Sequence, residues 1–473
     1  MLSNSEAELR RVPVNAWDIL EEDQKDQVMG LAEKYKIFLD GAKTERQGVE
    51  RAVEAAKRQG FLPLDSLPGF PEPGQGFFWV TRHKAIVLGV GGIKPFQEGF
   101  RLVGAHLDAP RLDLKPNPLY EGEGLALWKT HYYGGVKKYQ WTSIPLALHG
   151  VVIARDGRKV AITIGEEASD PVFTITDLLP HLAKDQLKKK LGEAIKGEDL
   201  NVLVASIPGG NKGGKDRFKL QVLDLLHQRY GMVEEDFAAA ELELVPAGQA
   251  RDIGLDRSMV GAYGQDDRVC AFTALEALLD VGVPAFTSLV VLADKEEIGS
   301  TGNTGMGSQF FKYLVADLAE RGGLTSYAAL GRIFLKSRAL SADTTTALDP
   351  TYENVLDKNN AARLGSGVVL TKYTGAGGKY HANDANAEFL GEVRTIFNRN
   401  GIAWQVGELG KVDQGGGGTI AQYLANYGMD VVDCGPPLLS IHAPLEISSK
   451  VDIYMAFKAY KVFLAEGGEV CES

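Results

Sequence analysis

The chain has 473 residues, of which 44% are apolar and 24% charged, and its 62 acidic against 51 basic residues give a net charge of −11. Such a length exceeds what one hydrophobic core usually supports, so two domains are expected. An acidic balance without a clustered basic face argues against nucleic acid as a partner. Three widely spaced cysteines, a start with neither a basic nor an apolar leader segment, and the absence of an apolar run of membrane-spanning length predict a cytoplasmic protein with no membrane partner.

The N-terminal part of the chain is predicted to be helical. Residues 17–60 have a charged, helix-like pattern that ends at Gly60, a residue type suited to cap a helix C-terminus. Two short runs bounded by glycine follow, 84–90 and 100–105, and both are predicted to be buried strands. The second run places His106 at its end.

The character of the sequence changes between about residue 109 and residue 246. This segment is rich in aromatic and turn residues, and 151–154 and 159–164 have the alternation that is typical of strands. It contains no metal-ligand candidate as good as those on either side of it. We therefore predict that 109–246 is an inserted, mostly β domain, and that 1–108 and 247–473 together form the catalytic domain.

An alternation of helices and strands resumes after Arg251. A helix is predicted over 270–279, and strands over 288–293, 367–371 and 429–433. Continuous apolar strands between helices are typical of a parallel or mixed sheet that is covered on both faces. The predicted fold class is therefore α/β, with a mixed sheet covered by helices and the inserted β domain as a second unit.

Five separated segments each place a metal-ligand residue just after a short apolar run. The candidate ligands are His106, Asp266, Glu297, Asp343 and His442. Imidazole and carboxylate suit zinc, cobalt or manganese, and ligands collect at the carboxyl ends of strands in open α/β sheets. We predict two divalent ions per subunit, zinc before cobalt or manganese, with Asp266 as the bridging carboxylate. One ion would bind His106 and Asp343, and the other Glu297 and His442.

Two further acids have predicted roles beside the ligands. Glu296 and Glu297 are consecutive, so their side chains cannot easily bind the same ion. Glu296 is therefore the candidate general base, which takes a proton from water and passes it to the leaving amine. Asp108 is suited to accept the second ring N–H of His106. Taken singly, these motifs also fit a plainer interpretation, because His-x-Asp is usually a hydrogen-bonded pair and paired glutamates usually solvate a helix face.

Residues 209–216 nearly match a phosphate-binding Walker A loop and precede a helical stretch over 218–230. Asp216 stands where such a loop has the Ser or Thr that binds magnesium, and its charge would lie beside the phosphates. A flexible loop is therefore the preferred interpretation, with nucleotide binding as the alternative.

These segments closely resemble the M18 metallopeptidases, the aspartyl aminopeptidase family, over essentially the whole chain. The matching stretches are 104–116, 165–181, 241–280, 294–299, 341–352 and 440–450. The resemblance implies the same five metal ligands, with Glu296 as the catalytic base and Asp108 as its supporting acid. It also implies an inserted assembly domain, zinc or cobalt at the active site, and a dimer-based homo-oligomer that is typically a tetrahedral dodecamer.

The resemblance further indicates three substrate-binding candidates. His181 matches a histidine that family members lend from the inserted domain to a neighbouring subunit's active site. Lys372 and His381 lie in a region that lines the substrate pocket in related peptidases, where a cation could pair with an acidic P1 side chain. An ordinary surface residue is the competing interpretation of His181 and of Lys372.

The predicted function is a metal-dependent aminopeptidase that releases N-terminal residues, acidic ones by family expectation, from peptides through a water that bridges the metals. Neutral or broad specificity is one alternative. Another is a two-metal carboxypeptidase or amidohydrolase, because the ligand set alone does not choose the terminus. The non-enzymatic alternative is a self-assembling scaffold or cargo protein with structural metals. Glu296 argues against it, since a structural site needs no base.

Overall fold

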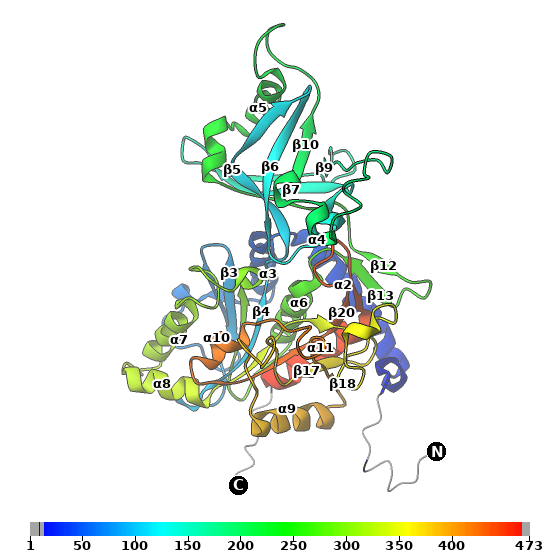
Figure 1. The fold of residues 1–473 in the computed structure, drawn as a ribbon. Coiled ribbons are helices and arrows are strands. Elements are labelled where there is room, and N and C mark those ends of the chain that lie inside the picture. The colour runs from blue at the N-terminus through cyan, green and yellow to red at the C-terminus, as the bar shows by residue number, and fades with distance from the viewer. Residues whose placement is uncertain (1–8, 10–13, 466–473) are drawn as a thin grey trace. The chain divides into compact units, whose positions relative to one another are not determined.

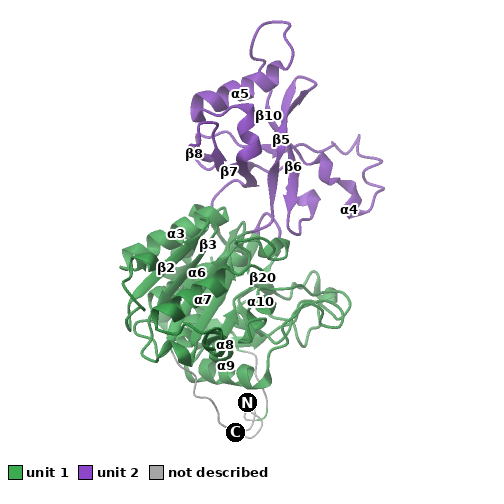
Figure 2. Cartoon of the chain, turned by 90° about the vertical axis from the view of Figure 1, so that its left-hand side faces the viewer, with its two compact units in different colours: residues 1–108, 250–441, 446–473 green, residues 109–249, 442–445 purple. Residues whose placement is uncertain are grey.

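The computed structural model describes residue 9 and residues 14–465. The chain divides into two compact units (Figure 2): unit 1 comprises 1–108, 250–441 and 446–473, and unit 2 comprises 109–249 and 442–445. Among the described helices, none combines the length and the apolar character that a membrane span requires.

Unit 1 is built around a mixed sheet that has nine strands in the described part of the chain (Figure 1). Their order is β1 (Leu62–Pro63), β2 (Gly76–Thr81), β3 (Ala85–Val90), β14 (Thr287–Ala293), β4 (Phe100–His106), β15 (Arg338–Ser341), β19 (Asp430–Gly435), β17 (Val368–Thr371) and β18 (Trp404–Val406). The central strands β14, β4, β15 and β19 run parallel, whereas β3 and β17 on either side of them run antiparallel. The strands predicted over 84–90, 100–105, 288–293, 367–371 and 429–433 are all confirmed within this sheet.

Helices cover both faces of this sheet, as the sequence predicts. One core contains side chains from α2 (Glu22–Gly41), α3 (Glu45–Arg58), α6 (Gln265–Leu279), α9 (Ala387–Arg399) and α11 (Lys450–Ala465). The other contains side chains from α7 (Phe310–Arg321), α8 (Tyr327–Lys336) and α10 (Ala421–Ala425). Along β4, Val103 and Ala105 belong to the first core, and Phe100 and Leu102 to the second. Alternate residues of a strand face opposite ways, so a strand that is buried on both faces is apolar throughout.

The predicted helical region over 17–60 is confirmed as two helices with recognisable ends. The Thr44 side chain accepts the Gln47 N–H at the start of α3, and the Gln47 side chain accepts the Thr44 N–H in return. This reciprocal capping satisfies two backbone donors that the helix itself leaves open. Gly60 has a φ of 79°, the left-handed conformation with which glycine commonly ends a helix.

A small five-stranded sheet of unit 1 lies in the described chain beside the start of α6. Its order is β12 (Arg251–Ile253), β13 (Met259–Ala262), β21 (Glu446–Ser449), β20 (Pro437–Leu439) and β16 (Thr345–Thr346). Strands of two to four residues are too short to produce a periodic pattern, so sequence analysis did not predict them. The sheet brings β21, from near the C-terminus, next to β13, which leads directly into α6.

Unit 2 is mostly β, as predicted. Its sheet has the order β8 (Lys159–Ile164), β7 (Leu146–Ile153), β11 (Ala240–Pro246), β5 (Arg111–Gly122), β6 (Leu125–Tyr133), β10 (Asn201–Ala205) and β9 (Thr174–Ile175), with α4 (Leu191–Ala194) and α5 (Arg217–Tyr230) as its α-helices in the described chain. The long hairpin of β5 and β6 turns at Glu123 and Gly124, whose φ angles are 52° and 77°. Two positive φ angles in a two-residue turn match the twist of the flanking strands. That unit 2 serves assembly stays a prediction.

Two features bear on other expectations from the sequence. Cys270 and Cys434 are buried free thiols, and Cys471 lies outside the described residues.

At the start of α5, after the glycine-rich loop, Glu121 Oε2 accepts the N–H groups of Phe218 at 2.7 Å and Lys219 at 2.9 Å. A carboxylate thus occupies the helix terminus to which a nucleotide would bring its phosphates, which favours the loop interpretation.

Candidate metal centre

The three parallel strands β14, β4 and β15 bring separate parts of the sequence to one edge of the main sheet. Ala293 on β14 pairs with His106 on β4, and Ser341 on β15 pairs with Gly104. Because the strands run in the same direction, the residues that follow each of them emerge at the same edge. His106, the turn that contains Glu296 and the segment that contains Asp343 are positioned in this way.

Asp266 reaches this edge from α6. Its Oδ1 lies 3.6 Å from His106 Nε2. His106, Asp266 and Asp343 each offer one ligand atom within 4.8 Å of the others, and a carboxylate oxygen of Asp266 also lies within 4.8 Å of one of Glu297. Two ligands of a tetrahedral zinc ion, each about 2.1 Å from it, lie about 3.4 Å apart. The nitrogen and oxygen donors of this cluster therefore fit a zinc-like cation. Asp266 is common to the group with His106 and Asp343 and to the pair with Glu297.

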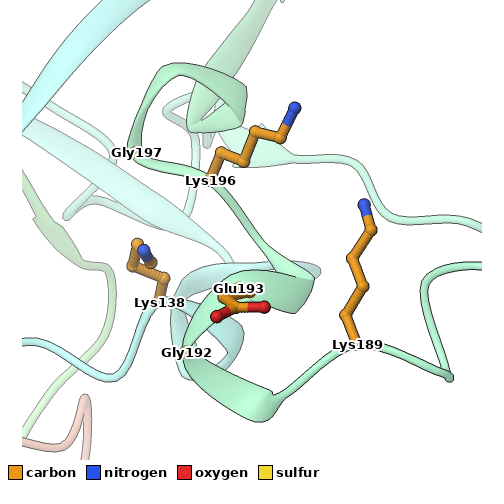
Figure 3. Close-up of a pocket in the computed structure, with 6 residues that line it drawn as sticks. All are labelled: Lys138, Lys189, Gly192, Glu193, Lys196 and Gly197. Carbon is orange, nitrogen blue, oxygen red and sulfur yellow. The ribbon is translucent and has the colours of Figure 1, made fainter.

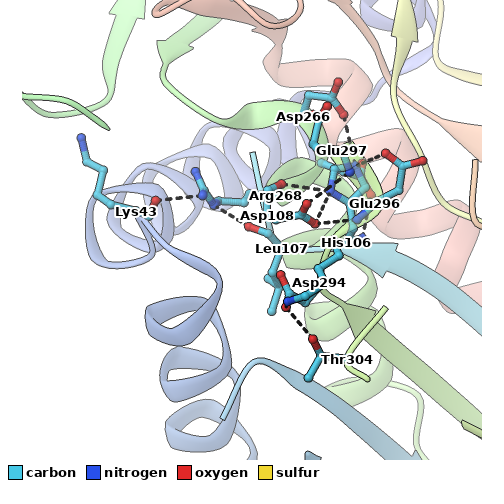
Figure 4. A network of polar contacts seen from close by, with 12 residues as sticks. Lys43, His106, Leu107, Asp108, Asp266, Arg268, Asp294, Glu296, Glu297 and Thr304 are labelled. Atoms are coloured by element: carbon cyan, nitrogen blue, oxygen red, sulfur yellow. Dashed lines mark hydrogen bonds and ion pairs between the residues drawn. The ribbon is translucent and has the colours of Figure 1, made fainter. Parts of the chain in front are cut away.

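Asp108 connects His106 to the glutamate pair (Figure 4). Its buried carboxylate accepts the Glu296 N–H at Oδ1, 3.1 Å away, and the Glu297 N–H at Oδ2, 3.2 Å away. His106 Nδ1 lies 3.3 Å from the same Oδ1 and 3.0 Å from the Asp108 carbonyl oxygen. This arrangement places the ring proton on Nδ1 and directs Nε2 towards Asp266. One carboxylate thus orients the candidate ligand His106 and the turn that contains both glutamates.

The Glu296 side chain faces the same histidine from a short 3₁₀ turn, η7 (Glu296–Ile298). Its Oε2 lies 3.8 Å from His106 Nε2. Lys295, just before the turn, has a φ of 67°, and its carbonyl oxygen accepts the Ser300 N–H at 2.7 Å. The backbone therefore turns sharply straight after β14, which places Glu296 and Glu297 over the end of the sheet.

Crowded carboxyl groups make the cluster electrostatically costly without a cation. Burial, then repulsion from Asp267, Asp266 and Glu296, raises the pKa of Asp343 well above its usual range. Burial raises the pKa of Glu296 to about 8, with repulsion from Glu297 adding to the shift and His106 opposing it. A divalent cation among these oxygens would compensate their mutual repulsion and favour their ionised forms.

Several supporting residues were not singled out by sequence reasoning. The buried Arg268 donates to the carbonyl oxygens of Leu107, at 3.2 Å, and Lys43, at 2.9 Å, and so holds the residue between His106 and Asp108. Asp267 Oδ2 accepts the His106 N–H at 3.3 Å. Both directly follow the predicted ligand Asp266, and this adjacency was the only signal that could have found them.

Beneath the glutamate turn, the buried Asp294 anchors the loop that continues from it. Asp294 Oδ2 accepts the Thr304 hydroxyl at 2.6 Å and lies 2.6 Å from Lys295 Nζ. Ten residues of chain are thereby closed into one loop at the end of β14. Asp294 supports the turn from below and is not itself among the candidate ligands.

The remaining predicted site residues come from other segments of the chain. His442 belongs to the segment of unit 2 at 442–445, where its Nδ1 lies 3.0 Å from the Gly135 carbonyl oxygen. His181 is an exposed residue of unit 2, and His381 is an exposed residue of a unit 1 loop. Lys372 forms an ion pair with Asp384, which also binds Lys379 at 2.9 Å.

A surface hollow in unit 2 contains none of the predicted site residues (Figure 3). Its volume is about 480 Å³, and it is lined by Lys138, Lys189, Gly192, Glu193, Lys196 and Gly197. Lys189 and Lys196 are exposed and Lys138 is partly buried, and the residues that line the hollow include one carboxylate and no imidazole. The groups that could hold a metal lie instead at the edge of the main sheet in unit 1.

An α/β sheet with an imidazole and several carboxylates gathered at the carboxyl end of its parallel strands defines a metal-dependent hydrolase in class. The sequence profile described as aminopeptidase I zinc metalloprotease (M18) matches residues 38–464. The chain therefore belongs to the M18 family and is a metal-dependent aminopeptidase that hydrolyses peptide bonds. The predicted family and enzyme class are confirmed, and the scaffold alternative is not supported.

Known relatives and solved structures are similar along almost the whole chain. A probable M18 family aminopeptidase 1 of Clostridium acetobutylicum is 48% identical over 453 residues, which are 95% of this chain and 97% of that protein. The crystal structure of an M18 aminopeptidase from Thermotoga maritima has a TM-score of 0.93 at 44% identity and covers 97% of this chain and 100% of its own. The S. cerevisiae mApe1 dodecamer, at 21% identity and a TM-score of 0.71, covers 91% of this chain and 95% of its own and shares the fold.

Proposed function

We propose that this enzyme is a two-metal aminopeptidase that removes single residues from the N-termini of peptides. The observation that carries the proposal is the convergence of His106, Asp266 and Asp343, with Glu296 3.8 Å from His106, at one edge of the sheet. In this proposal Asp266, His106 and Asp343 would hold one ion, and Asp266 and Glu297 would contribute to holding a second. Zinc is the expected metal, since the matching family is one of zinc metalloproteases.

His442 is proposed as the remaining ligand, next to Glu297. Its Nδ1 lies 3.0 Å from the Gly135 carbonyl oxygen, a contact that would place the ring proton on Nδ1 and present Nε2 as the donor to a metal. The support for this role is the resemblance of the surrounding sequence to the family, together with this tautomer.

The chain's own residues divide the proposed chemistry between them. Bound metal ions supply Lewis acidity, which polarises the scissile carbonyl group and lowers the pKa of water. Glu296 accepts the proton from the attacking water and returns it to the departing amine. Asp108 holds the turn of Glu296 and orients His106.

Two specificities are proposed for the N-terminal residue of the substrate, one for acidic residues and one for neutral or varied residues. An acidic preference is the family expectation, with Lys372 and His381 as the pairing groups. Lys372, however, already forms an ion pair with Asp384. Asp384 also pairs with Lys379, so the three groups keep a net charge of +1. The contact therefore weakens the attraction for an acidic side chain without removing it.

Assembly is also proposed, from the relatives. We expect unit 2, the inserted domain, to mediate a dimer-based homo-oligomer, because the structure of mApe1 from S. cerevisiae with the same fold is a dodecamer. His181 is exposed on unit 2, so it is available to act at a neighbouring subunit's active site.

The experiment compares hydrolysis of aspartyl-, glutamyl-, leucyl- and lysyl-nitroanilides by zinc-loaded protein and by Glu296→Gln, with bound zinc counted in both. The expected result is a kcat lower by about 10²–10⁴-fold in the variant at equal zinc content, because only the base is removed. An N-acetylated substrate is the control, since an aminopeptidase should not cleave it. Undiminished turnover by the variant would contradict the role of Glu296, and cleavage of the blocked substrate would favour a different amidohydrolase.

A further inference from the structure

A buried carboxylate that is not a candidate ligand lies behind Asp266. Glu446 begins β21, where it pairs with Ala262 on β13, and only 1% of its surface is exposed. Its Oε2 accepts the backbone N–H of Asp266 at 3.0 Å. Glu446 is four residues beyond His442 in the sequence, but it touches the backbone of the bridging candidate rather than offering itself to a metal.

This hydrogen bond satisfies a donor that α6 leaves open. The first N–H groups of a helix have no partner within it. Asp266 lies in that first turn with a non-helical backbone, at φ −80° and ψ 109°. A negative charge at a helix N-terminus is also favourable to the helix dipole. Glu446 therefore satisfies the N–H of Asp266 at the start of α6 from a strand that is about 180 residues away in the sequence.

The residue before Asp266 is held just as firmly. Gln265 Nε2 donates to the carbonyl oxygens of Val260, at 3.1 Å, and Glu446, at 2.6 Å. Its Oε1 accepts the hydroxyls of Ser448, at 2.5 Å, and Tyr35, at 3.3 Å. An amide side chain has two N–H donors and an oxygen with two lone pairs, and all four are used here. Rotation of the backbone at 265–266 would break several buried hydrogen bonds at once.

We propose that Glu446 is a positioning residue of the metal centre, which fixes the backbone of Asp266 so that its carboxylate faces both ions. The inference rests on the proposed function, in which Asp266 bridges the metals. A bridging carboxylate must reach two ions about 3.5–4 Å apart, so it tolerates little displacement. Residues that support a ligand in this way typically affect metal affinity by about 10–100-fold when they are replaced.

The test is the zinc dissociation constant of metal-free protein, measured by competition with a chromogenic chelator. Glu446→Met keeps the length of the side chain but removes the acceptor, and zinc binding is expected to weaken by about 10–100-fold. Glu446→Gln keeps a neutral acceptor, whose hydrogen bond is about half as strong, so its affinity should lie between those of Glu446→Met and wild type.

Asp452→Ala is the matched control. Asp452 is also a fully buried carboxylate that accepts backbone N–H groups, those of Gly365 and Gly367 at 2.7 Å each, and it is not among the candidate ligands. Its removal should lower the unfolding temperature and leave the zinc dissociation constant unchanged.

The outcomes separate a positioning role from a merely structural one. If Glu446→Met lowers the unfolding temperature as the control does but binds zinc as wild type does, the inference is wrong. Should Glu446→Met fail to fold, Glu446→Gln decides: weaker zinc binding supports the proposal, and unchanged binding overturns it. A wild-type protein that binds no zinc would instead overturn the proposed metal centre itself.

Discussion

Replacing Asp108 by asparagine tests how the metal centre is held together. The Asp108 carboxylate accepts two backbone N–H groups, from Glu296 at 3.1 Å and from Glu297 at 3.2 Å, and Oδ1 also faces His106 Nδ1 at 3.3 Å. An asparagine in the same place can keep the oxygen that faces His106 and Glu296. Its NH₂ group must then face the Glu297 N–H, where two donors oppose each other and neither is satisfied.

The expected cost follows from that single lost contact. A hydrogen bond to a charged acceptor contributes about 1.5–3 kcal/mol, so Asp108→Asn should lose about 2 kcal/mol. If the lost free energy is that which holds the glutamate turn in its metal-binding conformation, about 2 kcal/mol corresponds to a roughly thirty-fold weaker affinity for zinc. That value lies inside the range typical of residues that orient metal ligands.

Zinc titration and urea unfolding of the same samples provide the assay. Asp452→Asn is the control, because it makes the same chemical change in a buried carboxylate that accepts the N–H groups of Gly365 and Gly367. The control should lose a similar unfolding free energy but no zinc affinity. If Asp108→Asn binds zinc and turns over substrate as wild type does, the coupling of His106 to the glutamate turn through Asp108 is refuted.

Two pH-dependent predictions follow from the buried acids. Because the pKa of Glu296 is raised to about 8 and that of Asp343 well above its usual range, zinc binding at pH 7 should release protons. Calorimetric titration of zinc in buffers of different ionisation enthalpy measures the number of protons released. A binding enthalpy that does not depend on the buffer would contradict the prediction. Burial raises the pKa of Asp433 to about 6, against the hydrogen bond that its Oδ1 accepts from the Thr419 hydroxyl at 2.7 Å. The folded state then binds more protons than the unfolded state between about pH 4 and pH 6, so this group's contribution to stability falls as the pH rises through that window, by about 3 kcal/mol in total. The difference in unfolding free energy between Asp433→Asn and wild type, measured by urea denaturation from pH 4.5 to 7, should therefore shift in favour of the variant as the pH rises; a constant difference would show that Asp433 does not titrate in this way.

Elements with a strong local pattern were predicted well. The strand that ends at His106 is apolar at every position except Arg101 and His106 itself, because both faces of the sheet are covered, and its glycine-bounded run made it recognisable. The helix over 270–279 was predicted for its length and apolar character, and the structure extends it back to Gln265. The small sheet of β12, β13, β21, β20 and β16 was missed, because its strands are stabilised by pairing between distant segments rather than by their own sequences.

The candidate site also combines features that the local sequence predicts with features that depend on distant segments. His106, Asp266, Glu296 and Asp343 were found from residue type and from their positions after apolar runs, and the structure brings them together. The hydrogen bonds of Asp108 to the glutamate turn depend on backbone N–H groups nearly 190 residues away, which leave no mark in the sequence.

The sequence by itself determined which chemistry is available: imidazole and carboxylate groups at strand ends, a second glutamate that is the candidate base, and membership of a peptidase family. Only the tertiary structure decided which groups support them, as with Glu446 behind Asp266 and Arg268 behind Leu107. The physical reason is that a ligand's type is a property of one residue, whereas its orientation comes from hydrogen bonds across the fold. Such bonds form only when the pairing of β13 with β21, and of β4 with β14, places distant backbone and side-chain atoms within about 3 Å of each other.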